Sequence, residues 1–420
     1  MTNISDISAD PLYLTALASL GTGVPARLTS APTKNSIAVL PFVNMSDEQG
    51  QEHFTDGLTE DIITDLSNVP GFFVIARNSV FAYKGKPTDV RQIAHDLGVK
   101  YILEGSARRA GQRLRINVQL TDASEGGNHI WAERFDRELA DIFAVQDEMA
   151  RRIVQSISGK LTIGAKIERH HPADLNAYDL VVKSRNQWFV SKAANDEARS
   201  HLERAVALDP NYCEALRLLA RVLLSTWLLW GESQEPNRSA ALAMAQRAVA
   251  IDPQDSDAHS TLGFILLNER RWNEAKMQYD ISLQLNPNNA NTYILMVDFF
   301  VVSGKPKQAI EAAAMALRLN PRPHGNYFWV IGYAQIADGQ YENAVVTLRR
   351  EETYRTASRR LLAAALALLG RISDAQDEAK HFMATSPHWR ISTWIEYQPF
   401  MNPQDAQFWH DAYRLAGLPE

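Results

Sequence analysis

The chain of 420 residues contains a single cysteine, Cys213, which excludes an intramolecular disulfide and a metal site built from several cysteines. Long apolar runs are also missing, because the longest, such as "LLAAALALL" at 361–369, fall short of the ~20 residues that span a bilayer. The first apolar residues follow Asp6 and Asp10 rather than a basic stretch, so a secretory signal peptide is not expected. These absences predict a cytoplasmic protein that does not contact a membrane.

An excess of positive charge is missing too. Lys and Arg number 43 against 49 Asp and Glu, and the net charge of −6 gives no global attraction to nucleic acid. The sequence contains none of the motifs G-x-x-x-x-G-K-[ST], G-x-G-x-x-G, G-x-S-x-G and H-E-x-x-H. We therefore expect no catalytic residues, no cofactor, no metal and no direct contact with nucleic acid.

The first half of the chain changes character twice. Residues 1–35 end in the Gly/Pro/Ser/Thr mixture "GTGVPARLTSAPTKNS", which predicts an N-terminal segment and linker. Over residues 36–163 short β-rich runs such as "IAVLPF" and "FFVIAR" alternate with helical patterns. In "RLRINVQL" apolar and polar residues alternate after a turn at Ala110-Gly111-Gln112, as in a strand with one buried face. We predict a compact α/β domain with a mixed sheet, followed by a linker at 164–176.

The second half is helical and repetitive. The tripeptides "LDP", "IDP", "LNP" and "LNP" end in prolines that are 43, 34 and 34 residues apart. A 34-residue period of paired helices is typical of tetratricopeptide repeats, in which small residues occupy the helix crossings. Here Gly263, Ala275, Ala309 and Gly332 fall at such positions. The pattern predicts an α+β protein whose small α/β domain precedes a solenoid of about six repeats at 177–390.

The quoted strands, together with "HFTDGLTEDIITDL" and "LGVKYILEGSARRAGQRLRINVQLTDASEGGNHIWAERFDRELADIF", resemble the TolB-like N-terminal α/β module. In bacteria such modules precede tetratricopeptide repeats and commonly follow a class III adenylate or guanylate cyclase domain or a winged-helix DNA-binding domain. The resemblance covers about residues 36–390 and implies architecture more than activity. Because only about 35 residues precede the module, catalysis or DNA reading would be expected of a separate chain.

An acidic stretch follows the first predicted strand. "FTDGLTEDIITDL" carries four carboxylates between Asp56 and Asp65, and its apolar residues sweep one arc of a helix. Asp61 and Asp65 lie four residues apart at the border of that arc, so one interpretation is a cation site or an acid/base pair. No Lys or Arg occurs between Lys34 and Arg77 to orient such a pair. We favour the other interpretation, the start of a helix with a solvated acidic face.

Four arginines surround the predicted hairpin turn. Arg108, Arg109, Arg113 and Arg115 form a candidate anion site, because guanidinium groups hold phosphate or carboxylate through paired hydrogen bonds. The alternative is an exposed strand face that charge protects from edge pairing. His170 and His171, between the two domains, lack further metal ligands and indicate a polar hinge.

The repeats offer the best candidate for a binding site. In tetratricopeptide arrays the first helix of each pair lines a concave groove that takes a peptide or helix of a partner protein. The repeat phase places these residues in the groove: Lys183, Gln187, Arg217, Arg221, Ser260, Asn268, Asn291, Asp298, Trp329, Tyr333 and Arg360. The basic residues at its start favour an acidic peptide or a terminal carboxylate.

The aromatic-rich end, residues 391–420, is predicted to cap the solenoid, because terminal repeats expose an apolar face. A second interpretation makes Trp394, Phe400 and Trp409 a surface for a homo-oligomer. The sequence as a whole favours a non-enzymatic interaction scaffold with a protein partner. The alternative is the regulatory half of a cyclase-like signalling system, with a small ligand or nucleotide in the α/β domain.

Overall fold

The computed structural model describes residues 35–46, 52–124, 127–158, 171–229, 235–350 and 356–420. The predicted N-terminal segment and most of the predicted linker lie outside these residues. The chain divides into two compact units, which we describe one at a time. The first unit holds the described residues of Ala31–Ile265 and Met277–Asn289, and the second those of Leu266–Lys276 and Ala290–Glu420.

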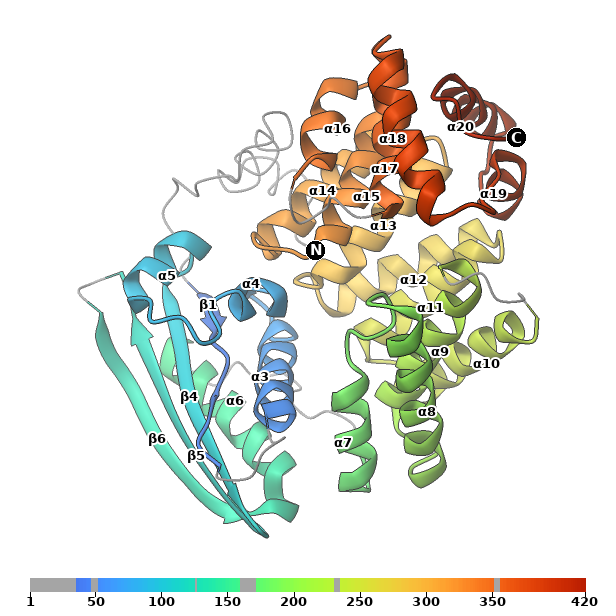
Figure 1. Cartoon of the computed structure of the whole chain (residues 1–420). Coiled ribbons are helices and arrows are strands. Elements are labelled where there is room, and N and C mark those ends of the chain that lie inside the picture. Colours follow the sequence, from blue (N-terminus) through green and yellow to red (C-terminus); the bar gives the residue numbers. More distant parts are fainter. Residues whose placement is uncertain (1–34, 47–51, 125–126, 159–170, 230–234, 351–355) are drawn as a thin grey trace. The chain divides into compact units, whose positions relative to one another are not determined.

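The first unit contains a six-stranded mixed sheet. Its strands are β1 (Ser36–Val39), β2 (Val43–Asn44), β3 (Phe73–Val74), β4 (Tyr101–Ala110), β5 (Arg113–Asp122) and β6 (Asn128–Glu138). The order is β3-β1-β4-β5-β6, and β2 pairs with β4 beyond the end of β1. Figure 1 labels β1, β4, β5 and β6 of this sheet. β1 runs parallel to β3 and β4, whereas β4, β5 and β6 are antiparallel. The predicted mixed sheet is thus confirmed.

The long hairpin of β4 and β5 follows its sequence pattern. β4 ends at Ala110 and β5 begins at Arg113, with Gly111 in the left-handed conformation (φ 58°) that the turn requires. Along β5 the apolar residues Leu114, Ile116, Val118 and Leu120 are all buried. The predicted alternation is therefore correct, and it fixes which face of the hairpin joins the core.

Among its described residues, the α/β domain also contains four helices and one 3₁₀ turn: α3 (Glu52–Ser67), α4 (Arg77–Phe81), α5 (Val90–Leu97), η1 (Leu139–Asp141) and α6 (Ile142–Ser158). α5 begins where Asp89 accepts a hydrogen bond from the Arg91 amide and ends at the left-handed Gly98. α3 and α6 pack against each other and cover one face of the sheet (Figure 1).

The rest of the described chain is helical. The repeat helices are α7 (Leu175–Ser184), α8 (Lys192–Leu208), α9 (Cys213–Leu228), α10 (Asn237–Ile251), α11 (Ser256–Asn268), α12 (Trp272–Leu285), α13 (Ala290–Val302), α14 (Pro306–Leu319), α15 (Gly325–Ala337), α16 (Tyr341–Leu348), α17 (Thr356–Leu368) and α18 (Ile372–Thr385). Two further helices follow, α19 (Ile391–Tyr397) and α20 (Pro403–Leu415). An α/β domain followed by helical repeats is the predicted fold class, which the structure confirms.

Within each unit the repeat helices pack in sequence order. α7 to α10 do so in the first unit, and α13 to α18 in the second, where α13, α15 and α17 also contact one another. Small residues permit these contacts, because Ala245, Ala309, Ala313 and Ala344 are fully buried at the crossings. The first helices of successive pairs therefore form a continuous face of the second unit.

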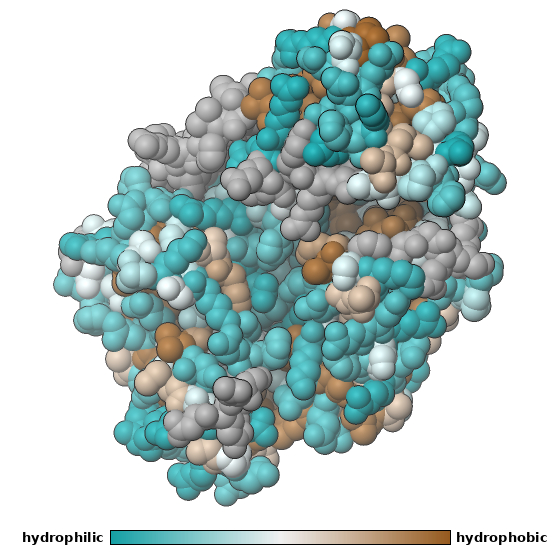
Figure 2. Space-filling model, in the orientation of Figure 1, coloured by the Kyte–Doolittle hydropathy of each residue, from teal (hydrophilic) through white to brown (hydrophobic). Residues whose placement is uncertain are grey.

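Hydrophilic residues predominate on the face of the molecule shown in Figure 2, and hydrophobic ones lie there in small patches. Exposed large apolar side chains such as Val43, Met45 and Met277 are distributed over different elements. Among the described residues, no helix combines the length and the apolar character needed to cross a membrane.

Gly332 in α15 provides a test of the repeat packing. A Cβ at this position would lie 2.6 Å from Cγ and Cδ2 of Leu348, which is fully buried in α16. We expect Gly332→Ala to lower the free energy of unfolding by about 1–3 kcal/mol, since the core must shift to accept the methyl group. Urea unfolding followed by circular dichroism measures this loss. Asn326→Ala, on the exposed surface of the same helix, is the control, and an equal effect of both changes would contradict the packing argument.

Candidate functional site

The acidic residues of α3 divide between two environments. Asp56 and Glu60 lie near the surface, where they form ion pairs with Lys84 (2.7 Å) and Arg77 (2.9 Å). Asp61, by contrast, is 2% exposed and Asp65 1% exposed. The prediction of a solvated acidic face is therefore wrong for these two residues. The buried face of α3 is wider than its apolar arc, because further elements pack on it.

Asp61 has three hydrogen-bond donors from distant parts of the chain. Its Oδ2 accepts from Tyr178 Oη on α7 (2.6 Å) and from Gln146 Nε2 on α6 (2.9 Å). Its Oδ1 accepts from Nη2 of Arg185, which follows α7 (2.8 Å). Arg185 is the cation that the neighbouring sequence lacks, and it lies 124 residues away.

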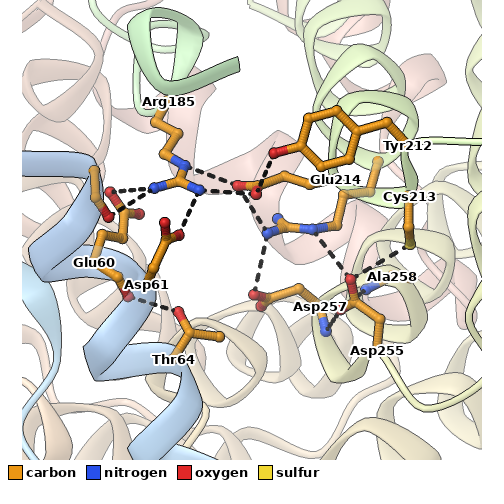
Figure 3. Close-up of polar contacts among 12 residues, drawn as sticks. Glu60, Asp61, Thr64, Arg185, Tyr212, Cys213, Glu214, Asp255, Asp257 and Ala258 are labelled. Atoms are coloured by element: carbon orange, nitrogen blue, oxygen red, sulfur yellow. Dashed lines mark hydrogen bonds and ion pairs between the residues drawn. The ribbon is translucent and has the colours of Figure 1, made fainter. Parts of the chain in front are cut away.

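Arg185 links Asp61 to a second carboxylate, Glu214, at the start of α9 (Figure 3). Arg185 Nε donates to Glu214 Oε1 and Nη2 to Oε2, both at 2.8 Å. The Arg185 side chain is only 5% exposed. Burial by itself would lower the pKa of Arg185, but Asp61 and Glu214 outweigh this effect and raise it well above its usual value. The guanidinium is therefore permanently charged.

The network continues through Arg217, one turn along α9. Its Nη2 lies 3.3 Å from Glu214 Oε1 and 3.6 Å from Asp257 Oδ2, and its Nε lies 3.5 Å from Asp255 Oδ2. Figure 3 shows the alternation of carboxylates and guanidiniums from α3 across α9 to the start of α11. We call the set Asp61, Arg185, Glu214, Arg217, Asp255 and Asp257 the buried ion network. Burial raises the pKa of Asp257, but Arg217, the hydrogen bond from Asn289 and Arg221 together outweigh it and hold that pKa below its ordinary value.

The buried ion network is suited to holding structure rather than to catalysis. Both oxygens of Asp61 and both oxygens of Glu214 are engaged by protein donors. Burial, and next the charge of Asp61, raise the pKa of Tyr178 well above its ordinary value, so the phenol stays protonated and donates. The network therefore fixes the first repeat helices to the α/β domain within this unit.

Three other contacts join repeat residues to the α/β domain within this unit. A Cβ at Gly57 of α3 would lie 2.9 Å from both Cγ atoms of Val182, so glycine permits the close approach of α7. After α12, Asn286 Nδ2 donates to Ser67 Oγ (2.9 Å), and Asn288 Nδ2 donates to Phe72 O (2.8 Å). The sequence analysis missed these asparagines, since "LNPNN" indicates only the end of a repeat.

The four arginines of the hairpin do not form one cluster. Arg108 and Arg115 are opposite each other on neighbouring strands, and Arg115 Nε donates to Asp136 Oδ1 at 2.8 Å. Arg109 is opposite the buried Leu114 and therefore points to the other face of the sheet. The predicted anion site thus divides into an exposed group, which includes Arg113, and the half-buried Arg109.

Arg109 lines a cavity of about 210 Å³ in the first unit. The cavity is lined by Phe54, Arg109, Gln112, Leu139, Leu175, Asn176, Tyr178 and Asp179. Burial raises the pKa of Asp179, and the charge of Arg109 opposes that shift. Its lining combines one guanidinium, one carboxyl and two amide side chains with the apolar side chains of Phe54, Leu139 and Leu175.

The predicted groove residues of the first unit differ in accessibility. Lys183, in the last turn of α7, is exposed, and Gln187 is half-buried. The guanidinium carbon of Arg221 lies 5.8 Å from the centre of the Trp188 ring. Arg217 is 8% exposed and belongs to the buried ion network, so its charge is already compensated inside the chain. Ser260 is buried and donates to Asp257 O.

The predicted groove residues of the second unit lie on its first helices and next to the turn after α11. Asn291 Oδ1 accepts from Tyr327 Oη (3.3 Å), and Asn268 is half-buried. The rings of Trp329 and Tyr333 are stacked with their centres 6.4 Å apart. The structure therefore brings the aromatic candidates together on α15.

The segment of residues 389–420 covers this aromatic face. The Tyr333 ring lies 4.6 Å from that of Trp409 on α20, and α20 packs against α17. Arg360 of α17 has its guanidinium carbon 5.1 Å from the Trp394 ring and 5.9 Å from the Tyr413 ring. Residues 391–420 were predicted to cover the end of the last repeat. The segment also reaches earlier repeats, where Trp272 Nε1 at the start of α12 donates to Pro399 O and the Met401 amide donates to Val302 O at the end of α13, both at 2.8 Å.

His171 and Cys213 both contact neighbouring residues of the first unit. His171 stacks on Phe143 at 4.7 Å, and its Nε2 lies 3.2 Å from Asp147 Oδ1. Cys213 is buried, and its Sγ donates to Ala248 O at 3.4 Å. Burial raises the pKa of this thiol and makes it a poor nucleophile. In the part of the chain that the structure describes, no three His, Cys, Asp or Glu side chains are grouped as metal ligands. His170 lies outside that part.

Comparisons with known proteins match parts of this chain. Residues 33–152 match a family described as HilA/YgeH-like transcriptional regulator, second domain. A protein of Rhizobium meliloti (strain 1021) named "Putative adenylate cyclase 3" is 48% identical over 249 residues, which cover 58% of this chain and 42% of that protein. The chain therefore matches less than half the length of this relative.

Solved structures with some similarity include Pseudomonas aeruginosa PilF, with a TM-score of 0.36 and 18% identity over 54% of this chain and 97% of that one. YrrB, described as a TPR protein with an unusual peptide-binding site, has a TM-score of 0.31 and 15% identity over 44% of this chain and 93% of that one. The helical repeats of this chain are established by its own helices and their packing.

The buried ion network makes a quantitative prediction. Arg185→Met leaves the carboxylate of Asp61 buried without a cation and that of Glu214 with Arg217 alone, and we expect the free energy of unfolding to fall by about 3–5 kcal/mol. Adding Asp61→Asn and Glu214→Gln removes the uncompensated charge and should restore part of the lost stability. Urea unfolding of the single and triple variants measures both values. Arg204→Met on the exposed surface of α8 is the control, and a triple variant no more stable than the single one would contradict the ion-pair account.

Asp298 on α13 predicts a dependence of stability on pH. Burial raises the pKa of its carboxyl to about 7, whereas its ordinary value is 3.8. The folded protein therefore holds this proton more tightly than the unfolded chain, and stability falls as the pH rises from about 4 to about 7. We expect Asp298→Asn to remove a decline of about 2–4 kcal/mol between pH 4 and pH 8. Unfolding at both pH values tests this, with the exposed Asp374→Asn as control. The same decline in both variants would refute the assignment.

Proposed function

We propose that the chain is a non-catalytic interaction scaffold that holds a segment of a partner protein against the first helices of its repeats. One observation carries this proposal: the face formed by α13, α15 and α17 already holds a helix, the chain's own α20. Tyr333 and Arg360, which the repeat phase predicts to line a groove, make that contact. A surface that accepts one helix through aromatic and cationic side chains is chemically suited to accept another.

The first unit supplies a second surface of the same kind. Lys183 is exposed on α7. Arg221 on α9 lies near Trp188, which is in the connection between α7 and α8. These side chains favour an acidic peptide or a terminal carboxylate, since cations combined with an aromatic ring bind both the charge and the apolar part of such a ligand. Arg217 takes no direct part, because three carboxylates already surround it.

The family resemblance suggests the setting of this scaffold. We infer that the α/β domain is a TolB-like docking or oligomerisation module of a bacterial regulatory system. The regulator domain that matches residues 33–152 and the cyclase-named relative both support a role in signalling or transcription.

A second candidate function rests on the cavity beside Arg109. The α/β domain could instead sense a small anionic ligand, with Arg109 as its charged contact and Phe54 and Leu139 as apolar walls. Cyclic AMP, ATP and pyrophosphate are suitable probes. A ligand at 100 times its dissociation constant raises the stability of the folded state by about 2.7 kcal/mol, which appears as a higher melting temperature. Arg109→Ala would abolish that increase if the cavity is the site.

Affinity capture from a bacterial lysate tests the scaffold. We expect the native chain to capture a specific protein. If the surface on α7 and α9 is used, the variant Lys183→Ala/Arg221→Ala should capture at least ten-fold less of that protein. The matched control is Lys192→Ala/Arg204→Ala, which removes two exposed positive charges from α8. Mass spectrometry identifies and quantifies the captured protein.

Equal capture by both variants would exclude the surface on α7 and α9, and would leave the face of the second unit or the α/β domain as the site. No specific capture, combined with a ligand-dependent melting temperature that needs Arg109, would replace the scaffold with the sensor. Circular dichroism of each variant shows whether it is folded.

A further inference from the structure

The segment of residues 389–420 has the position of a ligand within the second unit. It does not pair with one neighbour as the repeat helices do. Instead it contacts α15 through aromatic rings and α17 through helix packing, and the start of α12 and the end of α13 through single hydrogen bonds. The first helices form the face on which partner segments are proposed to bind. The segment and a partner would therefore compete for the same side chains.

The contact consists mainly of aromatic and cation–π interactions. Trp409 is 1% exposed and Tyr413 is fully buried, and they lie one turn apart on the face of α20 that meets the repeats. Arg360 lies within 6 Å of the rings of Trp394 and Tyr413. A pair of aromatic residues four positions apart on a helix is thus the feature that the face recognises.

Hydrogen bonding at this contact is incomplete. Three donor atoms of the face are buried without a hydrogen-bond partner among the described residues: Trp329 Nε1, Tyr333 Oη and Arg360 Nε. A buried donor without an acceptor destabilises the state that contains it. A helix that offers the same aromatic pair together with a carboxylate would satisfy donors that the chain's own segment leaves unused. Such a helix has an advantage over the segment at the same site.

We propose that residues 389–420 are a self-ligand, which occupies the binding face of α13, α15 and α17 and must leave before a partner helix can bind there. This inference rests on the proposed scaffold function and adds its regulation. The partner is a helical segment with two aromatic residues four positions apart and a neighbouring carboxylate. The stretch of residues 386–388 between α18 and the self-ligand is the hinge, since Pro387 and His388 are exposed.

A synthetic peptide of residues 389–420 tests the self-ligand directly. Fluorescence anisotropy measures its binding to the full native chain and to a full chain carrying Trp409→Ala and Tyr413→Ala, which frees the face. If the native face is open about 1% of the time, the freed chain binds the peptide about 100-fold more tightly than the native chain. Adding Tyr333→Ala and Arg360→Ala to the freed chain should remove the binding. Lys305→Ala and Lys307→Ala in the freed chain are the matched control at α14 and should leave it unchanged.

A freed chain that is folded by circular dichroism but binds the peptide no better than the native chain would overturn the proposal. If the freed chain does not fold, hydrogen exchange of the native chain with saturating isotope-labelled peptide replaces it. Displacement predicts at least ten-fold faster exchange in α20, and unchanged exchange would refute the self-ligand. Because the peptide belongs to this chain, the result does not depend on finding a partner, and a failure here leaves the lysate experiment to judge the scaffold separately.

Discussion

The guanidinium of Arg185 between Asp61 and Glu214 is the interaction on which the arrangement of the first unit depends. A buried charge is tolerated only when its partners are in place, and here three secondary-structure elements must meet to supply them. Such a group penalises every arrangement in which α3, α7 and α9 are displaced. Hydrophobic packing at Gly57 and Val182 adds close contact but less directional preference. The ion pairs of Arg185 therefore specify how α3, α7 and α9 are oriented, and the hydrophobic packing stabilises that arrangement.

The sequence predicts local structure well because local structure depends on residues close in the chain. Alternation in β5, the cap of α5 at Asp89 and the repeat period each follow from neighbours within a few positions or from one fixed spacing. Asp61 is different. Its helix and its position at the edge of the apolar arc are predictable, but its burial depends on Arg185, which is 124 residues away. A single sequence contains no pattern that connects the two.

In the predicted groove, too, the residue type follows from the sequence but its surroundings do not. Arg217 and Arg221 lie one turn apart on α9, and the repeat phase assigns both to the groove. Arg217 is enclosed by carboxylates from α9 and the start of α11, whereas Arg221 lies near Trp188. The phase of a helix predicts the direction of a side chain, but not what another element places against it. For that reason the repeat pattern predicts a binding face but not which of its charges are available to a partner.

The buried ion network and the contact made by α20 differ in how many of their polar groups are hydrogen-bonded. That difference separates a permanent attachment from an exchangeable one. In the buried ion network the carboxylate oxygens of Asp61 and Glu214 all accept from protein donors, so no competing ligand can offer them more. Around Tyr333 and Arg360 buried donors lack acceptors, and a ligand with a carboxylate can improve on the contact made by α20. Selection for a stable fold favours the first arrangement. A surface that exchanges one helix for another requires the second arrangement. The bound helix must then be replaceable by a helix that makes more favourable contacts.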